Sequence, residues 1–114
     1  INAKERKCIK IISKFPVIRS YGSASDIAKS GIKWLSKDEK SKLIYAATDT
    51  ISIYELARKI TNLYNLNPIV SDIDDSLKKD DYSCDTNGFK DYLKTAGIKI
   101  SNLDKQIQET FEYI

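Results

Sequence analysis

Apolar residues recur along most of this chain at helical spacing, and shorter apolar runs lie between the helical segments. The clearest helical pattern is Ile51–Tyr64, where Ser52 and Glu55 form an S-x-x-E capping box and Ile51 and Leu56 are placed as a hydrophobic staple. Its apolar face comprises Ile53, Leu56, Ala57, Ile60, Leu63 and Tyr64. The segment Asn65–Pro68 is expected to end this helix.

Three further helices are predicted by their start and stop signals. Residues 24–36 follow Ser23 as the N-cap, with Asp26 in the first turn. Asp85 or Thr86 begins a short helix that Gly97 ends, and Ser101 with Asp104 begins the last helix. The first of the three has one apolar stripe, in which Gly31 is interpreted as a point of close approach to a neighbouring element: Ala24, Ile27, Ala28, Gly31, Ile32 and Leu35. Trp34 flanks that stripe. The other two carry apolar faces made by Phe89, Tyr92, Leu93 and Ala96, and by Leu103, Ile107, Phe111 and Ile114.

Short strands are expected between these helices. After an early helical turn the chain should be extended from about Ile9, and the Phe15–Pro16 boundary is followed by extended Val17–Ile18. Leu43–Ala47 reads as a short buried strand and Ile69–Val70 as another. Residues 71–83 are polar and read as a long surface loop. The prediction is a mixed α/β fold, with short strands alternating with amphipathic helices in a single domain over residues 1–114.

Composition removes several classes of function. The 114 residues are 41% hydrophobic and 31% charged, and no apolar run approaches the ~20 residues of a membrane span, so no membrane partner is expected. Histidine is absent, which excludes a Ser-His-Asp triad, a Cys-His dyad and a His-ligated metal site within the chain. Cys8 and Cys84 are interpreted as two ordinary thiols, in keeping with a reducing, cytoplasmic location.

Charge divides the chain into a basic and an acidic half, with a net charge of +7 over residues 1–60 and −4 over residues 61–114. The basic half suggests an anionic partner, or else a solvated lysine-rich surface. Nucleic acid is not the expected partner, because basic and aromatic residues do not interleave as in RNA-recognition motifs. The aspartates of residues 71–83 could bind Ca²⁺ or Mg²⁺, but they lack the glycine and terminal glutamate of an EF-hand loop; a solvated loop is expected and no metal site is predicted.

Two stretches taken together resemble the C-terminal part of the extended short-chain dehydrogenase/reductases, the NAD-dependent epimerase/dehydratase family that acts on nucleotide sugars. In RSYGSASDIAKSGIKWL, residues 19–35, the family pattern R-D-[FY]-x-x-V-x-D-[LIV]-A is matched at Arg19, Tyr21, Asp26, Ile27 and Ala28. The second stretch, LIYAATDTISIYELARKITNLYNL, is similar to the strand-and-helix unit that follows in the family. A weaker third match covers residues 84–114, so the resemblance extends over about residues 17–114.

This resemblance implies the small substrate lobe of such an enzyme without its Rossmann core, and therefore a C-terminal fragment of a larger protein. The parent would be an NAD(P)-dependent epimerase, dehydratase or reductase that binds a UDP- or dTDP-sugar, with a homodimer as one option. NAD(P) is expected in the missing N-terminal domain and no cofactor in this chain. The dinucleotide fingerprint and the catalytic Tyr-x-x-x-Lys pair are absent, so no catalytic residue is assigned here.

Four residues are carried over as candidates for substrate binding. The arginine that matches Arg19 contacts the diphosphate in epimerase members of the family, and Tyr21 is the aromatic residue of the same motif. Lys78 and Lys79 stand where the family often has a second arginine, although lysine lacks the bidentate fork of the guanidinium. The alternative function is a small basic α/β interaction module, without enzymatic activity, that binds nucleic acid or an acidic protein.

Overall fold

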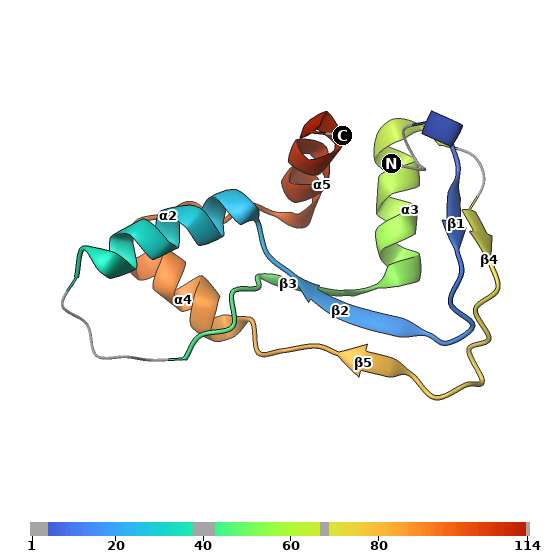
Figure 1. Cartoon of the computed structure of the whole chain (residues 1–114), viewed down its shortest axis with the longest axis horizontal. Coiled ribbons are helices and arrows are strands. Elements are labelled where there is room, and N and C mark those ends of the chain that lie inside the picture. Colours follow the sequence, from blue (N-terminus) through green and yellow to red (C-terminus); the bar gives the residue numbers. More distant parts are fainter. Residues whose placement is uncertain (1–4, 38–42, 67–68, 114) are drawn as a thin grey trace.

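The computed structural model describes residues 5–37, 43–66 and 69–113. Within these ranges the chain forms five strands and four helices, which confirms the predicted mixed α/β class (Figure 1). The elements in chain order are β1 (Ile9–Ile11), β2 (Val17–Tyr21), α2 (Ala24–Leu35), β3 (Asp49–Ser52), α3 (Ile53–Tyr64), β4 (Ile69–Ser71), β5 (Asp80–Tyr82), α4 (Asn87–Thr95) and α5 (Leu103–Tyr113).

The described strands form two small sheets. The central strand β2 is antiparallel to β3 and parallel to β5, so that Arg19 lies opposite Ile51 on one side and Tyr82 on the other. The parallel pair β1–β4 stands apart from this sheet, with Ile9 opposite Ile69 (Figure 1). Each sheet therefore joins strands from distant parts of the sequence.

The capping signals place three helix ends where they were predicted. The Ser23 hydroxyl accepts a hydrogen bond from the backbone N–H of Asp26 at the start of α2. The Ser52 hydroxyl does the same for Glu55 at the start of α3, and it also donates to the Glu55 carboxylate. Asn65 ends α3 in the left-handed conformation, with φ of 50°. Pro68, the far end of the predicted stop signal, lies outside the described residues.

The two C-terminal helices also form, although one of them begins with a different cap. The Asp85 carboxylate accepts from the N–H of Asn87 before α4, and Gly97 adopts a φ of 69° after it. The Asn102 side chain, not Ser101, accepts from the N–H of Lys105 at the start of α5. Ser101 is instead bound to Asp26, as described below. Ile114, the predicted end of the apolar face of α5, lies outside the described residues.

Two strand predictions were wrong. Leu43–Ala47 is not a strand: Leu43 and Tyr45 are 81% and 55% exposed, and only Ala47 of this run is buried. Conversely, residues 71–83 are not entirely loop, because Asp80–Tyr82 forms β5. The backbone N–H of Asp80 donates to the carbonyl of Pro16, so pairing with β2 overrides the low strand propensity of aspartate.

The orientation of α2 also differs from the expectation that Gly31 approaches a neighbouring element. The face that packs on the rest of the chain carries Asp26, Ser30 and Trp34, which recur at every fourth position. Trp34 contacts Tyr92 of α4 with ring centroids 5.1 Å apart, and the Tyr92 hydroxyl donates to the carbonyl of Ser30. All six residues of the apolar stripe are exposed, and a Cβ added at Gly31 would meet no atom within 4 Å.

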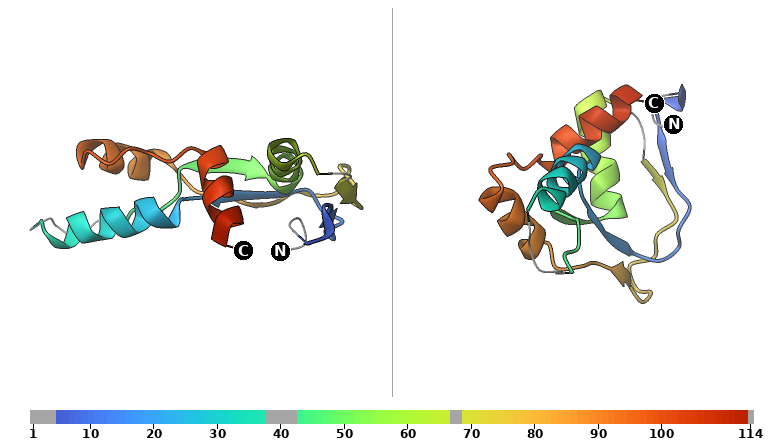
Figure 2. Two further views of the ribbon diagram at one scale, coloured as in Figure 1. Left: turned by 90° about the horizontal axis from the view of Figure 1, so that it is seen from above. Right: turned by 60° about the vertical axis from the view of Figure 1, so that its left-hand side comes forward.

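The molecule is a thin plate, measuring 49 × 33 × 16 Å along its principal axes (Figure 2). Its radius of gyration is 16.3 Å, whereas a compact domain of this length has about 13 Å. Among the residues that the structure describes, the buried apolar side chains are Ile11, Ala47, Ala57, Phe89, Leu93, Ala96, Leu103 and Ile107. Three of these are alanines, so the core is small for the length of the chain.

Candidate functional site

The candidate site is centred on one face of β2. Arg19 and Tyr21 are alternate residues of this strand and therefore project from the same face of the sheet. Tyr21 is followed by the tight turn Gly22–Ser23, which leads into α2. The turn packs closely on the backbone of Ala46. A Cβ at Gly22 would overlap the carbonyl oxygen of Ala46, and the N–H of Thr48 donates to the carbonyl of Tyr21.

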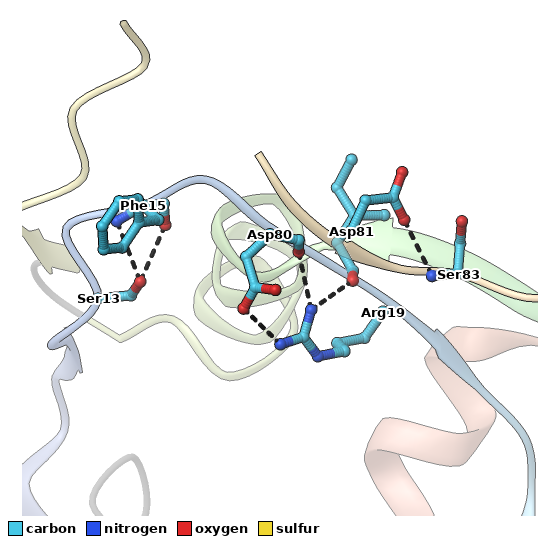
Figure 3. A network of polar contacts seen from close by, with 7 residues as sticks. Ser13, Phe15, Arg19, Asp80, Asp81 and Ser83 are labelled. Atoms are coloured by element: carbon cyan, nitrogen blue, oxygen red, sulfur yellow. Dashed lines mark hydrogen bonds and ion pairs between the residues drawn. The ribbon is translucent and has the colours of Figure 1, made fainter. Parts of the chain in front are cut away.

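The guanidinium of Arg19 is held by β5 and by its own strand (Figure 3). Nη2 donates to the Asp80 carboxylate at 2.8 Å, while Nη1 contacts the backbone carbonyls of Asp80 and Ile18, each at 2.8 Å. The guanidinium carbon also lies 4.9 Å from the centre of the Tyr82 ring, within the range of a cation–π contact. The Arg19 side chain is 34% exposed, so the ion pair is open to solvent on one side.

Lys78 and Lys79 directly precede the two aspartates with which β5 begins. Hydrogen bonds from Ser83 are the main cause of the lowered pKa of Asp81, and the charges of Lys79 and Arg19 lower this pKa further. Lys78 and Lys79 are both exposed in the segment that leads into β5.

The environment of the Tyr21 side chain differs from that of Arg19 on the same strand. Burial raises the pKa of its phenol, and the positive charge of Arg19 opposes this shift. The ring therefore faces a partly dehydrated space close to a cation, where a neutral hydroxyl can donate or accept a hydrogen bond.

That space is a groove of about 780 Å³ between the β2–α2 turn, α3 and α5. Its apolar wall includes Leu56 and Ile60 of α3 and Leu103, Ile107 and Phe111 of α5. Phe111 also stacks on Tyr64 at a centroid distance of 3.8 Å, which fixes α5 against α3. Tyr21 is the one candidate residue that lines the groove, because Arg19, Lys78 and Lys79 are not among its lining residues.

A buried polar network holds the turn and α5 in place. The Asp26 carboxylate, 1% exposed, accepts from the N–H of Ser101 at 2.8 Å and from its hydroxyl at 3.0 Å. The Gln106 amide donates to the carbonyl of Ser101 and to the hydroxyl of Thr48, which is fully buried. Over the described residues, every buried side-chain nitrogen or oxygen has a partner. Asp26 is therefore an anchor between two distant segments as well as a helix-start residue.

The described residues contain no obvious reactive constellation. Both cysteines are free thiols, and residues 5–37, 43–66 and 69–113 bring no three acidic or thiol side chains together as a metal site would require. The Asp74 carboxylate, for example, binds Ser76 of its own turn, and these hydrogen bonds lower its pKa. No described helix has the length and apolar character to cross a membrane.

The strand-to-helix turn at Gly22 is tightly packed. Gly22 is the glycine that begins a strand-to-helix turn, but the space a pyrophosphate would need beside it is filled by the backbone of Ala46. The Gly22 turn is therefore not built as a phosphate-binding turn.

The sequence singles out Arg19 and Tyr21 as candidates but does not indicate the residues that contact Arg19. Asp80 and Tyr82, the partners of Arg19, lie about sixty positions away in a segment taken for a loop. The aspartate pair beside Lys78 and Lys79 was a possible signal, since it offers a counter-charge for a strand-end arginine. No family model and no curated protein matches the chain.

Proposed function

We propose that this chain is the nucleotide-sugar-binding lobe of an NAD(P)-dependent epimerase, dehydratase or reductase, in which Arg19 binds the diphosphate of a UDP- or dTDP-sugar. The observation that carries the proposal is the placement of Arg19 and Tyr21 on one face of β2, with Tyr21 lining a large groove. The motif resemblance predicted a cation and an aromatic residue at one binding edge, and this arrangement supports that prediction.

The hydrogen bonds of Arg19 leave part of the guanidinium for a ligand. The three contacts to Asp80 and Ile18 use at most three of its five N–H groups. The described residues supply no acceptor for the N–H on Nε or for the second N–H on Nη2. In a planar guanidinium the N–H of Nε and one N–H of Nη2 lie parallel along one edge, which is the geometry that binds two phosphate oxygens, and none of the three contacts uses Nε. Asp80 then keeps the fork in position while a diphosphate binds the other edge.

Lys79 and Tyr21 extend the proposed site on either side of Arg19. Lys79 adds positive charge at the start of β5, where it acts on the same Asp81 carboxylate as Arg19. Tyr21 presents a neutral phenol to the groove, which suits an uncharged hydroxyl of a sugar. In this proposal catalysis and NAD(P) binding belong to a second body, because the sequence has neither the dinucleotide fingerprint nor a Tyr-x-x-x-Lys pair.

The proposal is tested by calorimetric titration of UDP-glucose and dTDP-glucose into the complete gene product. Loss of a bidentate, charge-assisted contact costs about 1.5–3 kcal/mol, so Arg19→Ala should weaken binding about 10- to 100-fold. Arg19→Lys should recover part of this loss, because it restores the charge without the fork. Arg58→Ala is the matched control, since Arg58 is exposed on α3 and does not line the groove. Equal affinity of the Arg19→Ala and wild-type proteins, or no binding of either nucleotide sugar, would refute the proposal.

A further inference from the structure

The groove between α3 and α5 contains a hydrogen-bond acceptor that the fold does not use. Gln106 is 7% exposed, and its amide nitrogen Nε2 donates to the carbonyl of Ser101 at 2.9 Å. The same nitrogen donates to the Thr48 hydroxyl at 3.1 Å and to the Asp49 carboxylate at 3.3 Å. Because a backbone carbonyl can only accept, these contacts fix the orientation of the amide, with Nε2 turned toward the buried network.

The amide oxygen of Gln106 is accessible from the groove. Oε1 accepts no hydrogen bond from the described residues, whereas every fully buried side-chain nitrogen or oxygen among them has a partner. Oε1 therefore keeps an open side, and the cavity that Gln106 lines is this groove. An acceptor that is nearly buried and lacks a partner favours a ligand that brings an N–H or O–H donor to it.

Glu109 adds negative charge one turn further along α5. It is the one charged side chain among the described residues that line the groove, and at this spacing its Cβ lies about 5–6 Å from that of Gln106. Lys105 Nζ lies 3.6 Å from the Glu109 carboxylate, which is longer than a normal hydrogen bond, and the two side chains are 58% and 38% exposed. The ion pair is therefore weak, and the carboxylate can bind a second cation.

The walls around these two acceptors are apolar and partly aromatic. Aliphatic residues of α3 and α5 line the groove together with the rings of Tyr21, Phe111 and Tyr113, on which an aromatic ligand can pack. Its volume of about 780 Å³ is typical of sites for small organic molecules, which combine apolar walls with a few polar groups. An anionic ligand would be repelled by Glu109, and an entirely apolar ligand would leave Oε1 of Gln106 unpaired.

We propose that the groove is a second binding site of this chain, and that its ligand is a small organic amine with an aromatic body. The ammonium group of the ligand donates to Oε1 of Gln106 and to the carboxylate of Glu109, while the ring packs on the apolar wall. The amine replaces Lys105 as the closer cation of Glu109. These contacts are made by α5 and do not involve Arg19, so the inference is independent of nucleotide-sugar binding.

Calorimetric titration of the complete gene product with three indole compounds at neutral pH tests this proposal. Tryptamine is a cation, tryptophol is the corresponding neutral alcohol and indole-3-acetate is an anion. We expect tryptamine to bind about tenfold more tightly than tryptophol, because it gains a charge-assisted hydrogen bond, and indole-3-acetate to bind most weakly. Glu109→Gln keeps the shape of the side chain and removes its charge, so it should abolish this preference. Glu112→Gln is the matched control and should retain the preference, since Glu112 is an exposed glutamate of the same helix that does not line the groove.

Lys105→Ala provides a test in the opposite direction. Removal of the cation that competes for Glu109 should strengthen tryptamine binding about two- to fivefold and leave tryptophol binding unchanged. Equal affinities for the three compounds, tightest binding of indole-3-acetate, a preference for tryptamine that survives Glu109→Gln, or no binding of any of them would overturn the proposal. Since no nucleotide sugar is added, tryptamine binding without sugar binding would refute the proposed function alone.

Discussion

Replacing Asp26 with alanine should lower the free energy of unfolding by about 2–4 kcal/mol, because it removes the acceptor of two buried hydrogen bonds. An unsatisfied buried donor costs about 1–3 kcal/mol, and the substitution leaves both the N–H and the hydroxyl of Ser101 in that state. The gross cost is therefore about 2–6 kcal/mol, which is reduced because the buried carboxylate no longer has to be dehydrated.

A set of related variants makes this prediction specific. Ser101→Ala removes only the hydroxyl donor and should cost about 1 kcal/mol, since the backbone N–H keeps its bond to Asp26. The double variant Asp26→Ala with Ser101→Ala should lose less stability than the sum of the single changes, because the two side chains share a bond. Asp91→Ala on the exposed face of α4 is the control and should change stability by less than about 0.5 kcal/mol.

Urea unfolding followed by the fluorescence of Trp34 is a suitable assay. Trp34 is the only tryptophan of the chain and packs on Tyr92, so its emission reports the contact between α2 and α4. The midpoint should decrease in the order Asp91→Ala, Ser101→Ala, Asp26→Ala. A loss at Asp26 no larger than the loss at Asp91 would refute the reasoning, because the network would then contribute nothing that water cannot replace.

Three further predictions concern the turn and the ends of elements. Gly22→Ala should lower the free energy of unfolding in urea by about 1–3 kcal/mol, because the added Cβ overlaps the backbone of Ala46. Gly31→Ala should raise it by up to ~1 kcal/mol, because the added Cβ meets no atom and alanine favours the helix. Equal effects of the two substitutions would contradict the geometry. Because burial raises the pKa of Tyr21 above its usual value of about 10, the neutral phenol contributes stability below that pH and this contribution is lost as the pH rises through the folded-state pKa. In an ultraviolet titration Tyr21→Phe should remove an ionisation step that lies above the usual phenol pKa of about 10. Loss of a step at or below that pH would argue against burial of Tyr21. Asn65→Ala should lower the free energy of unfolding by about 1 kcal/mol, because alanine tolerates the left-handed conformation at the end of α3 poorly. The helix signal in circular dichroism should then be lost at a lower temperature. An unchanged melting curve would count against the left-handed conformation.

The helices could be predicted because their signals are local. Ser52 and Glu55 are three residues apart, and both the cap and its partner are visible in one turn of sequence. The strands were harder, since strand β5 has the sequence DDY and exists because β2 lies beside it. Leu43–Ala47 has the composition of a buried strand, but among the described residues it has no strand partner. It is therefore a loop. The pattern of apolar and polar residues within one segment does not predict which distant segment will pair with it as a strand.

The same distinction applies to the candidate site. The position of Arg19 on β2 followed from a motif within ten residues, but its ion pair with Asp80 depends on the register between β2 and β5. The apolar stripe of α2 was recognised correctly, and only its direction was missed. That direction is set by Asp26, which looked like an ordinary helix-start residue and proved to be bound to Ser101, 75 positions away.

The pairing of β1 with β4 and of β2 with β5 has a consequence for how the protein is made. During synthesis the first two strands leave the ribosome without partners, and β5 follows only after some sixty more residues have been added. Helix α2 has to wait longer, because Ser101 is synthesised 75 residues after Asp26. Over that interval the nascent chain carries an unanchored helix with an exposed apolar stripe, and exposed apolar surface of this kind favours aggregation until the anchor is made.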